Sequence, residues 1–163
     1  MKDFYFKGGD FASYKDTCRA AKIFGVKPEE NPREDYVERL QGIIERCLRG
    51  YVPAGGELKL IGVYLYKDWE QEADLQNTYG FTLQVAEDYA IIGISYSLLT
   101  YEMPVFHDHV FLHECCHLYE MSHGERFQNR FNEVEFDYYF QHDVRMDGRK
   151  ATVRKPARKG WKM

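Results

Sequence analysis

Apolar residues recur at helical spacing in the first third of the chain. Between residues 11 and 24 they return every three or four positions, and Gly25 then offers a helix stop. A second periodic segment runs over residues 32–48. Asn31 precedes it as an N-cap and Pro32 takes the first helical position. The pattern therefore predicts two consecutive N-terminal helices.

The middle of the chain changes to strand patterns. Residues 51–57 contain a proline and a glycine pair and predict a loop, whereas residues 67–75 are compatible with a loop or a short helix. Segments rich in β-branched and aromatic residues predict three strands, at 58–66, 81–85 and 90–95. The last two are joined by a tight turn near Glu87-Asp88.

Helical patterns return toward the end of the chain. Pro104 opens a third helix that we expect to run to about Met121 as an amphipathic helix. A fourth follows Gly124, with one apolar stripe formed by Phe127, Phe131, Val134 and Tyr138. This order predicts an α+β fold with a small, mostly antiparallel or mixed sheet. We expect one domain over residues 1–143 and a basic, flexible tail over residues 144–163.

The third predicted helix carries the sequence His113-Glu114-Cys115-Cys116-His117. Histidines four residues apart lie on one side of a helix, where two neutral imidazoles can bind the same Zn²⁺ ion. Glu114 is rotated by about 100° from His113. Its carboxylate can therefore lie beside the metal and take a proton from a metal-bound water. The H-E-x-x-H pattern thus indicates a zinc-dependent hydrolase.

A catalytic zinc site needs a third protein ligand. His123 can supply it only if the helix ends first, because six residues of continuous helix turn its side chain about 600° from that of His117. Glu133 and Glu135 on the next helix are the alternatives. Asp137, four residues after Glu133, is then a candidate to orient His113 or His117 through a hydrogen bond to its ring, without binding the metal itself. The residue spacing alone leaves this choice open.

The segment 113–127, written H-E-x-x-H-x5-H-G-x-x-F, resembles the SprT-like and YgjP/WLM zinc peptidases. The resemblance implies a zincin-like fold, zinc ligation by His113, His117 and His123, and Glu114 as general base. It also implies a metallopeptidase activity on peptide or protein substrates. The chain has no C-terminal four-cysteine zinc ribbon. Glu133 and Asp137 resemble instead the gluzincins and the ImmA/IrrE-type peptidases, for which Glu133 would be the third ligand.

Charge and cysteine content restrict the partners and the cellular location that we expect. The chain has 163 residues and a formal charge of −4. Residues 145–163 carry +7, which leaves −11 on the rest. Nucleic-acid contact is therefore expected only through the tail, and only weakly. Four cysteines without a disulfide pattern, and no apolar segment typical of a signal peptide or membrane span, favour the cytoplasm.

Three interpretations of function remain at this point. The first is a zinc metallopeptidase, the second is an inactive zincin-fold binding or regulatory protein, and the third is a protease directed to nucleic acid by its tail. An intact Glu114 favours the first. Among the neighbouring residues, we expect Cys115 and Cys116 to be small core residues and His109 to be exposed.

Overall fold

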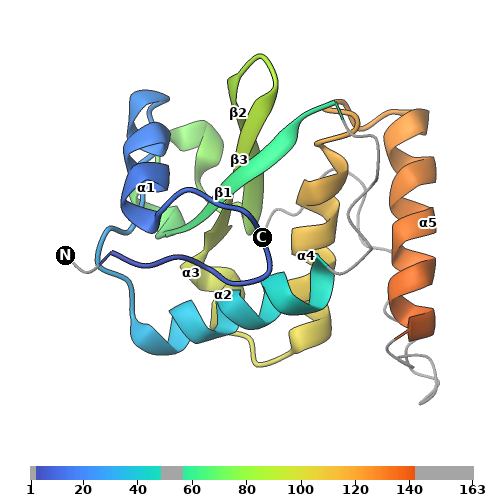
Figure 1. The fold of residues 1–163 in the computed structure, drawn as a ribbon, viewed down its shortest axis with the longest axis horizontal. Coiled ribbons are helices and arrows are strands. Elements are labelled where there is room, and N and C mark those ends of the chain that lie inside the picture. The colour runs from blue at the N-terminus through green and yellow to red at the C-terminus, as the bar shows by residue number, and fades with distance from the viewer. Residues whose placement is uncertain (1–2, 49–56, 142–163) are drawn as a thin grey trace.

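The computed structural model describes residues 3–48 and 57–141. Their elements form an α+β fold with one three-stranded mixed sheet, as predicted, and five α-helices, of which the short helix at Tyr96–Leu99 was not predicted (Figure 1). In chain order the elements are α1 (Tyr14–Ile23), α2 (Glu34–Cys47), β1 (Lys59–Tyr66), the 3₁₀ helices η1 (Asp68–Glu70) and η2 (Ala73–Leu75), β2 (Gly80–Ala86), β3 (Tyr89–Ser95), α3 (Tyr96–Leu99), α4 (Pro104–Cys116) and α5 (Glu125–Gln141).

The sheet has the strand order β1-β3-β2, with β1 parallel and β2 antiparallel to the central strand β3. The outer edge of β1 is covered by the chain itself. The backbone N–H of Ala12 donates to Ile61 O at 2.8 Å, and that of Glu29 donates to Leu65 O at 2.7 Å. Among the described residues, no backbone hydrogen bond occupies the outer edge of β2. Within residues 3–48 and 57–141, the outer edge of β2 thus has no backbone partner.

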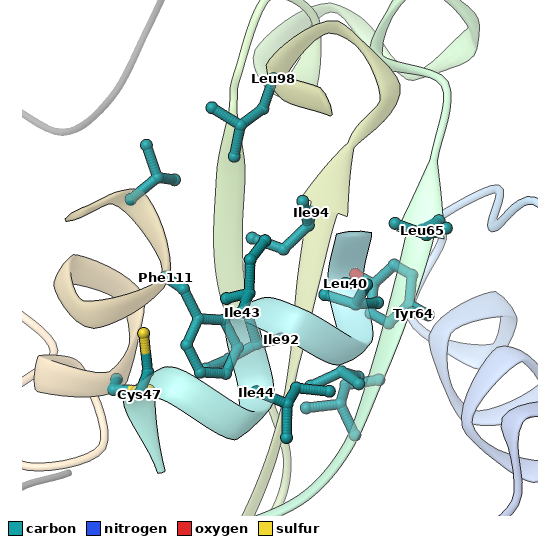
Figure 2. Packing of buried hydrophobic residues seen from close by; sticks show 14 of the residues in the cluster. Leu40, Ile43, Ile44, Cys47, Tyr64, Leu65, Ile92, Ile94, Leu98 and Phe111 are labelled. Carbon is teal, nitrogen blue, oxygen red and sulfur yellow. The ribbon is translucent and has the colours of Figure 1, made fainter. Parts of the chain in front are cut away.

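Helices cover both faces of the sheet. Helix α1 lies on one face, where Thr17 contacts Gly62 so closely that a Cβ atom at position 62 would lie 2.3 Å from its Oγ1. Helices α2 and α4 cover the other face, where the C-terminal end of α2 packs against α4, and α5 packs against α4 on the side away from the sheet (Figure 1). Figure 2 shows Ile43 of α2, Ile92 of β3 and Phe111 of α4 meeting in the core between them.

Helix α4 lies at the centre of this arrangement and is buried on every side. All residues from His107 to Cys116 are buried, and five of them are polar. The helix is therefore not amphipathic, contrary to the expectation from its sequence. It also ends at Cys116 rather than near Met121. The chain tightens into a turn there, because the N–H groups of residues 117–119 each donate to the carbonyl three residues back, at 3.0 Å, instead of four residues back.

Two other predicted boundaries shift for identifiable reasons. Helix α1 begins at Tyr14 instead of residue 11, because the Ser13 side chain caps it by accepting a hydrogen bond from Asp16 N at 3.1 Å. Helix α2 begins at Glu34, so Asn31 is not its N-cap. The backbone before it is instead held by Tyr96, whose hydroxyl accepts a hydrogen bond from Arg33 N at 3.0 Å.

The remaining predictions of secondary structure agree with the described residues. The hairpin turn lies at residues 87–88, and the ambiguous segment 67–75 forms the two 3₁₀ helices. No helix in residues 3–48 or 57–141 combines the length and the apolar character that crossing a membrane requires. The predicted loop 51–57 falls almost entirely outside the described residues, and so does the predicted basic tail.

Candidate metal centre

Three histidines gather where α4 ends and the chain turns toward α5. Each of His113, His117 and His123 offers one ring nitrogen, and these three atoms all lie within 4.8 Å of one another. His113 and His117 are buried, whereas His123 is exposed at the surface. The early end of α4 makes this possible, because the segment 117–124 is not helical and brings His123 back over the last turn.

The ring nitrogens are placed as metal ligands would be. His113 Nε2 and His123 Nε2 are 3.3 Å apart. Two nitrogens bound at 2.0–2.1 Å to one tetrahedral zinc are separated by roughly 3.3 Å. His117 Nδ1 lies 3.1 Å from Glu120 O, and a carbonyl can only accept, so Nδ1 carries the proton of the neutral ring. The lone pair is therefore on His117 Nε2, as a ligand requires.

Burial keeps two of these imidazoles neutral. It lowers the pKa of His113 to about 2, and the neighbouring His117 and His123 add to the effect. It lowers the pKa of His117 to about 4, against the opposing hydrogen bond to Glu120 O. Both rings are thus unprotonated at neutral pH before any cation arrives. A metal ion binds without first displacing protons from them.

The ring of Phe127 packs against all three histidine rings. Phe127 is buried at the start of α5, and its ring centroid lies 4.9 Å from that of His113, 4.5 Å from that of His117 and 5.1 Å from that of His123. Phe131 lies one turn further, 5.4 Å from His113. The apolar stripe of α5 therefore also limits the ring orientations at the site.

Glu114 lies beside the histidines but points to the sheet. Thr82 Oγ1 on β2 is 2.9 Å from Glu114 Oε1 and 2.8 Å from Glu114 O. Burial raises the pKa of Glu114 to about 8, while the hydrogen bond from Thr82 acts in the opposite direction. A divalent cation held by the neighbouring histidines would favour the ionised carboxylate. Glu114 therefore lies on the same helix as two of the potential ligands, with its carboxylate hydrogen-bonded to the sheet, and it is not part of the three-histidine group.

The other candidate ligands lie elsewhere. Glu133 is exposed on α5, 3.3 Å from Arg130 Nη1, and it is not part of the three-histidine group. Glu135 is buried and its Oε2 lies 2.5 Å from His109 Nε2. Asp137 is exposed and is not part of the three-histidine group. The expectation that His109 is exposed was wrong, because α5 covers it.

Cys115 and Cys116 are buried core residues, as expected. Burial raises the pKa of Cys116 to about 12 and that of Cys115 well above its ordinary value. Because only a thiolate binds zinc strongly, these two thiols are poor ligands at neutral pH.

A cleft of about 400 Å³ opens beside His117. It lies between the turn after α4 and the β2–β3 hairpin, with Leu118 and Gln84 among its walls. The described lining residues include no Lys or Arg, and the charged ones are Glu57, Glu87, Asp88 and Glu120. The candidate metal centre therefore adjoins an accessible, acidic space.

Comparison of the chain with protein family models, with curated proteins and with solved structures found no match.

The sequence did not predict three features of the site: the hydrogen bond from Thr82 to Glu114, the hydrogen bond from His117 to the Glu120 carbonyl, and the burial of His109. Hydrophobic spacing places Thr82 on a strand, but only the strand register brings it to Glu114.

The depressed pKa values predict how the metal-free protein responds to acid. His113 and His117 stay neutral in the folded state, whereas in the unfolded chain they bind protons below a pKa of about 6.5. The unfolded state then holds more protons, so the free energy of unfolding falls as pH drops from about 6.5 toward 4. The slope is at most about 1.4 kcal/mol per pH unit for each histidine.

Urea unfolding in the presence of a chelator, at pH 7 and at pH 5.5, measures this decrease in the free energy of unfolding. The double variant His113→Gln/His117→Gln should lose less stability over the same interval, because glutamine does not titrate. All other groups, including the buried His107, are common to both proteins and cancel. Equal losses in the two proteins would contradict the assignment of neutral, buried rings.

Proposed function

We propose that the protein is a zinc-dependent metallopeptidase in which His113, His117 and His123 bind the ion and Glu114 is the general base. The observation that carries this proposal is the convergence of the three histidines, with one pair of Nε2 atoms 3.3 Å apart, next to a buried carboxylate. Catalytic zinc sites have three protein ligands and leave the fourth position to water or substrate, whereas structural zinc sites have four protein ligands. The three-histidine group matches the catalytic arrangement.

The chemistry divides between the ion and the chain. A zinc ion in this position would acidify a water and polarise a substrate carbonyl. The protein supplies the proton acceptor, since Glu114 is one residue from His113 and is excluded from bulk solvent. Its carboxylate takes the proton of the attacking water and can return it to the leaving amine. The Glu120 carbonyl holds the His117 ring in the tautomer that this role needs.

The open edge of β2 is the proposed place for a peptide. An extended peptide can add to an exposed strand through backbone hydrogen bonds, and β2 lies against α4, which carries Glu114. The acidic cleft adjoins the hairpin end of this strand. Its charge favours substrates with lysine or arginine side chains on that side of the scissile bond.

A zincin-like fold is part of this proposal. It is supported by the combination of a sheet with one open antiparallel edge strand, a buried helix carrying H-E-x-x-H across that sheet, and a third histidine in the turn that follows. The placement of Glu133 away from the histidines favours the SprT-like resemblance over the gluzincin one.

The affinity for zinc distinguishes His123 from Glu133 as the third ligand. We expect about one zinc per chain, and we expect His123→Ala to weaken zinc binding by more than the roughly 10- to 100-fold that loss of an outer-shell group costs. His123 is exposed, so its removal should leave the fold intact. Competition with a chelating dye measures the affinity, and Glu133→Ala is the matched surface control.

Glu133→Ala should bind zinc as the unchanged protein does. Tight binding by His123→Ala, or loss of binding in Glu133→Ala, would overturn the proposed ligand set. The double variant His113→Ala/His117→Ala sets the baseline, because one remaining histidine cannot retain the ion.

Hydrolysis depends on Glu114 if the proposal is correct. Glu114→Gln keeps the size of the side chain but cannot accept a proton, so turnover of labelled casein should fall about 10²- to 10⁴-fold while zinc content stays the same. Glu133→Gln makes the same chemical change at an exposed position of α5 and should not affect turnover. Equal casein hydrolysis by the unchanged protein and Glu114→Gln would remove Glu114 from the mechanism.

A further inference from the structure

Thr82 lies on β2 with its backbone directed toward the open edge. In the antiparallel pair β2–β3, Ser95 N–H donates to Tyr79 O at 2.9 Å, and the register continues through Gly80 opposite Ile94 and Thr82 opposite Ile92. Hydrogen-bonded and non-hydrogen-bonded pairs alternate along such a ladder. Thr82 therefore belongs to a non-hydrogen-bonded pair, and its N–H and C=O point away from β3.

The side chain of Thr82 points to α4. Its Oγ1 lies 2.9 Å from Glu114 Oε1 and 2.8 Å from Glu114 O, and Glu114 itself is only 3% exposed. The hydroxyl is thus within hydrogen-bond distance of one carboxylate oxygen of Glu114, to which it can donate its single proton. The bond to Oε1 consequently fixes one carboxylate oxygen of Glu114 to the sheet and leaves Oε2 for the proton transfer.

We infer that Thr82 is a positioning residue that connects substrate pairing on β2 with the orientation of the general base. The inference rests on the proposed function. One residue offers its backbone groups to the peptide and its hydroxyl to Glu114. The position of the base relative to the peptide is therefore set across a single residue instead of through a flexible loop. Small displacements of a catalytic group are costly, which gives this short connection its value.

The substitution Thr82→Val tests the role of the hydroxyl. Valine keeps the β-branched shape and the strand preference and removes only the hydrogen bond. We expect kcat for labelled casein to fall about 10- to 100-fold, as when a group that orients a catalytic residue is lost, with KM and zinc content nearly unchanged. Thr82→Ser restores the hydroxyl and should recover most of kcat. Thr17→Val is the matched control, because it removes a buried threonine hydroxyl on the other face of the sheet.

A second measurement does not depend on turnover. In protein labelled with ¹³C at the glutamate carboxyl carbon, the Glu114 resonance is assigned by its disappearance in Glu114→Gln. It should move in Thr82→Val and return in Thr82→Ser.

Two results would overturn the inference: full kcat in Thr82→Val, or a serine variant as impaired as the valine variant. If Glu114→Gln were fully active, the proposed function itself would fail. Loss of activity in Glu114→Gln with full activity in Thr82→Val would leave that function standing without a role for Thr82.

Discussion

The structure depends on the burial of a helix that carries polar residues on all of its sides. Helix α4 lies between the sheet, α2 and α5, so each of its buried polar groups needs a partner from another element or from the turns beside it. Asp108 pairs with Arg46 of α2, at 2.6 and 2.9 Å, and with the Tyr138 hydroxyl of α5. The other four polar residues of this set are His107, His109, His113 and Glu114.

The partners of these groups position the elements around α4. His107 Nε2 lies 2.6 Å from Tyr101 O in the turn before the helix, and Glu135 of α5 reaches His109. Toward the C-terminal end of α4 the polar side chains have a different kind of partner. Glu114 meets a strand hydroxyl, and the His113 ring meets a second histidine ring across the turn. The same need for polar partners that ties the first half of α4 to its neighbours brings together, at its end, three histidines that could hold a metal ion.

Local signals in the sequence predicted most of the fold, because helix periodicity, strand composition and turn residues each act over a few positions. The histidine spacing on α4 is also local, so His113, Glu114 and His117 were found as a group. The choice between His123 and Glu133 was not local. It depended on where α4 ends, and that end is marked by backbone hydrogen bonds from residues 117–119 to carbonyls three residues back, with no glycine among them. The contact of Thr82 and the burial of His109 depend on tertiary packing, which hydrophobic spacing does not encode.

The central claim is that the end of α4 forms one open three-histidine zinc site. X-ray absorption at the zinc edge of the zinc-loaded protein tests it most directly. The account predicts a first shell of four light atoms at about 2.0 Å, with outer-shell scattering from three imidazoles. A sulfur shell at about 2.3 Å would place Cys115 or Cys116 on the metal. That result, or a signal from fewer than three imidazoles, would contradict the account.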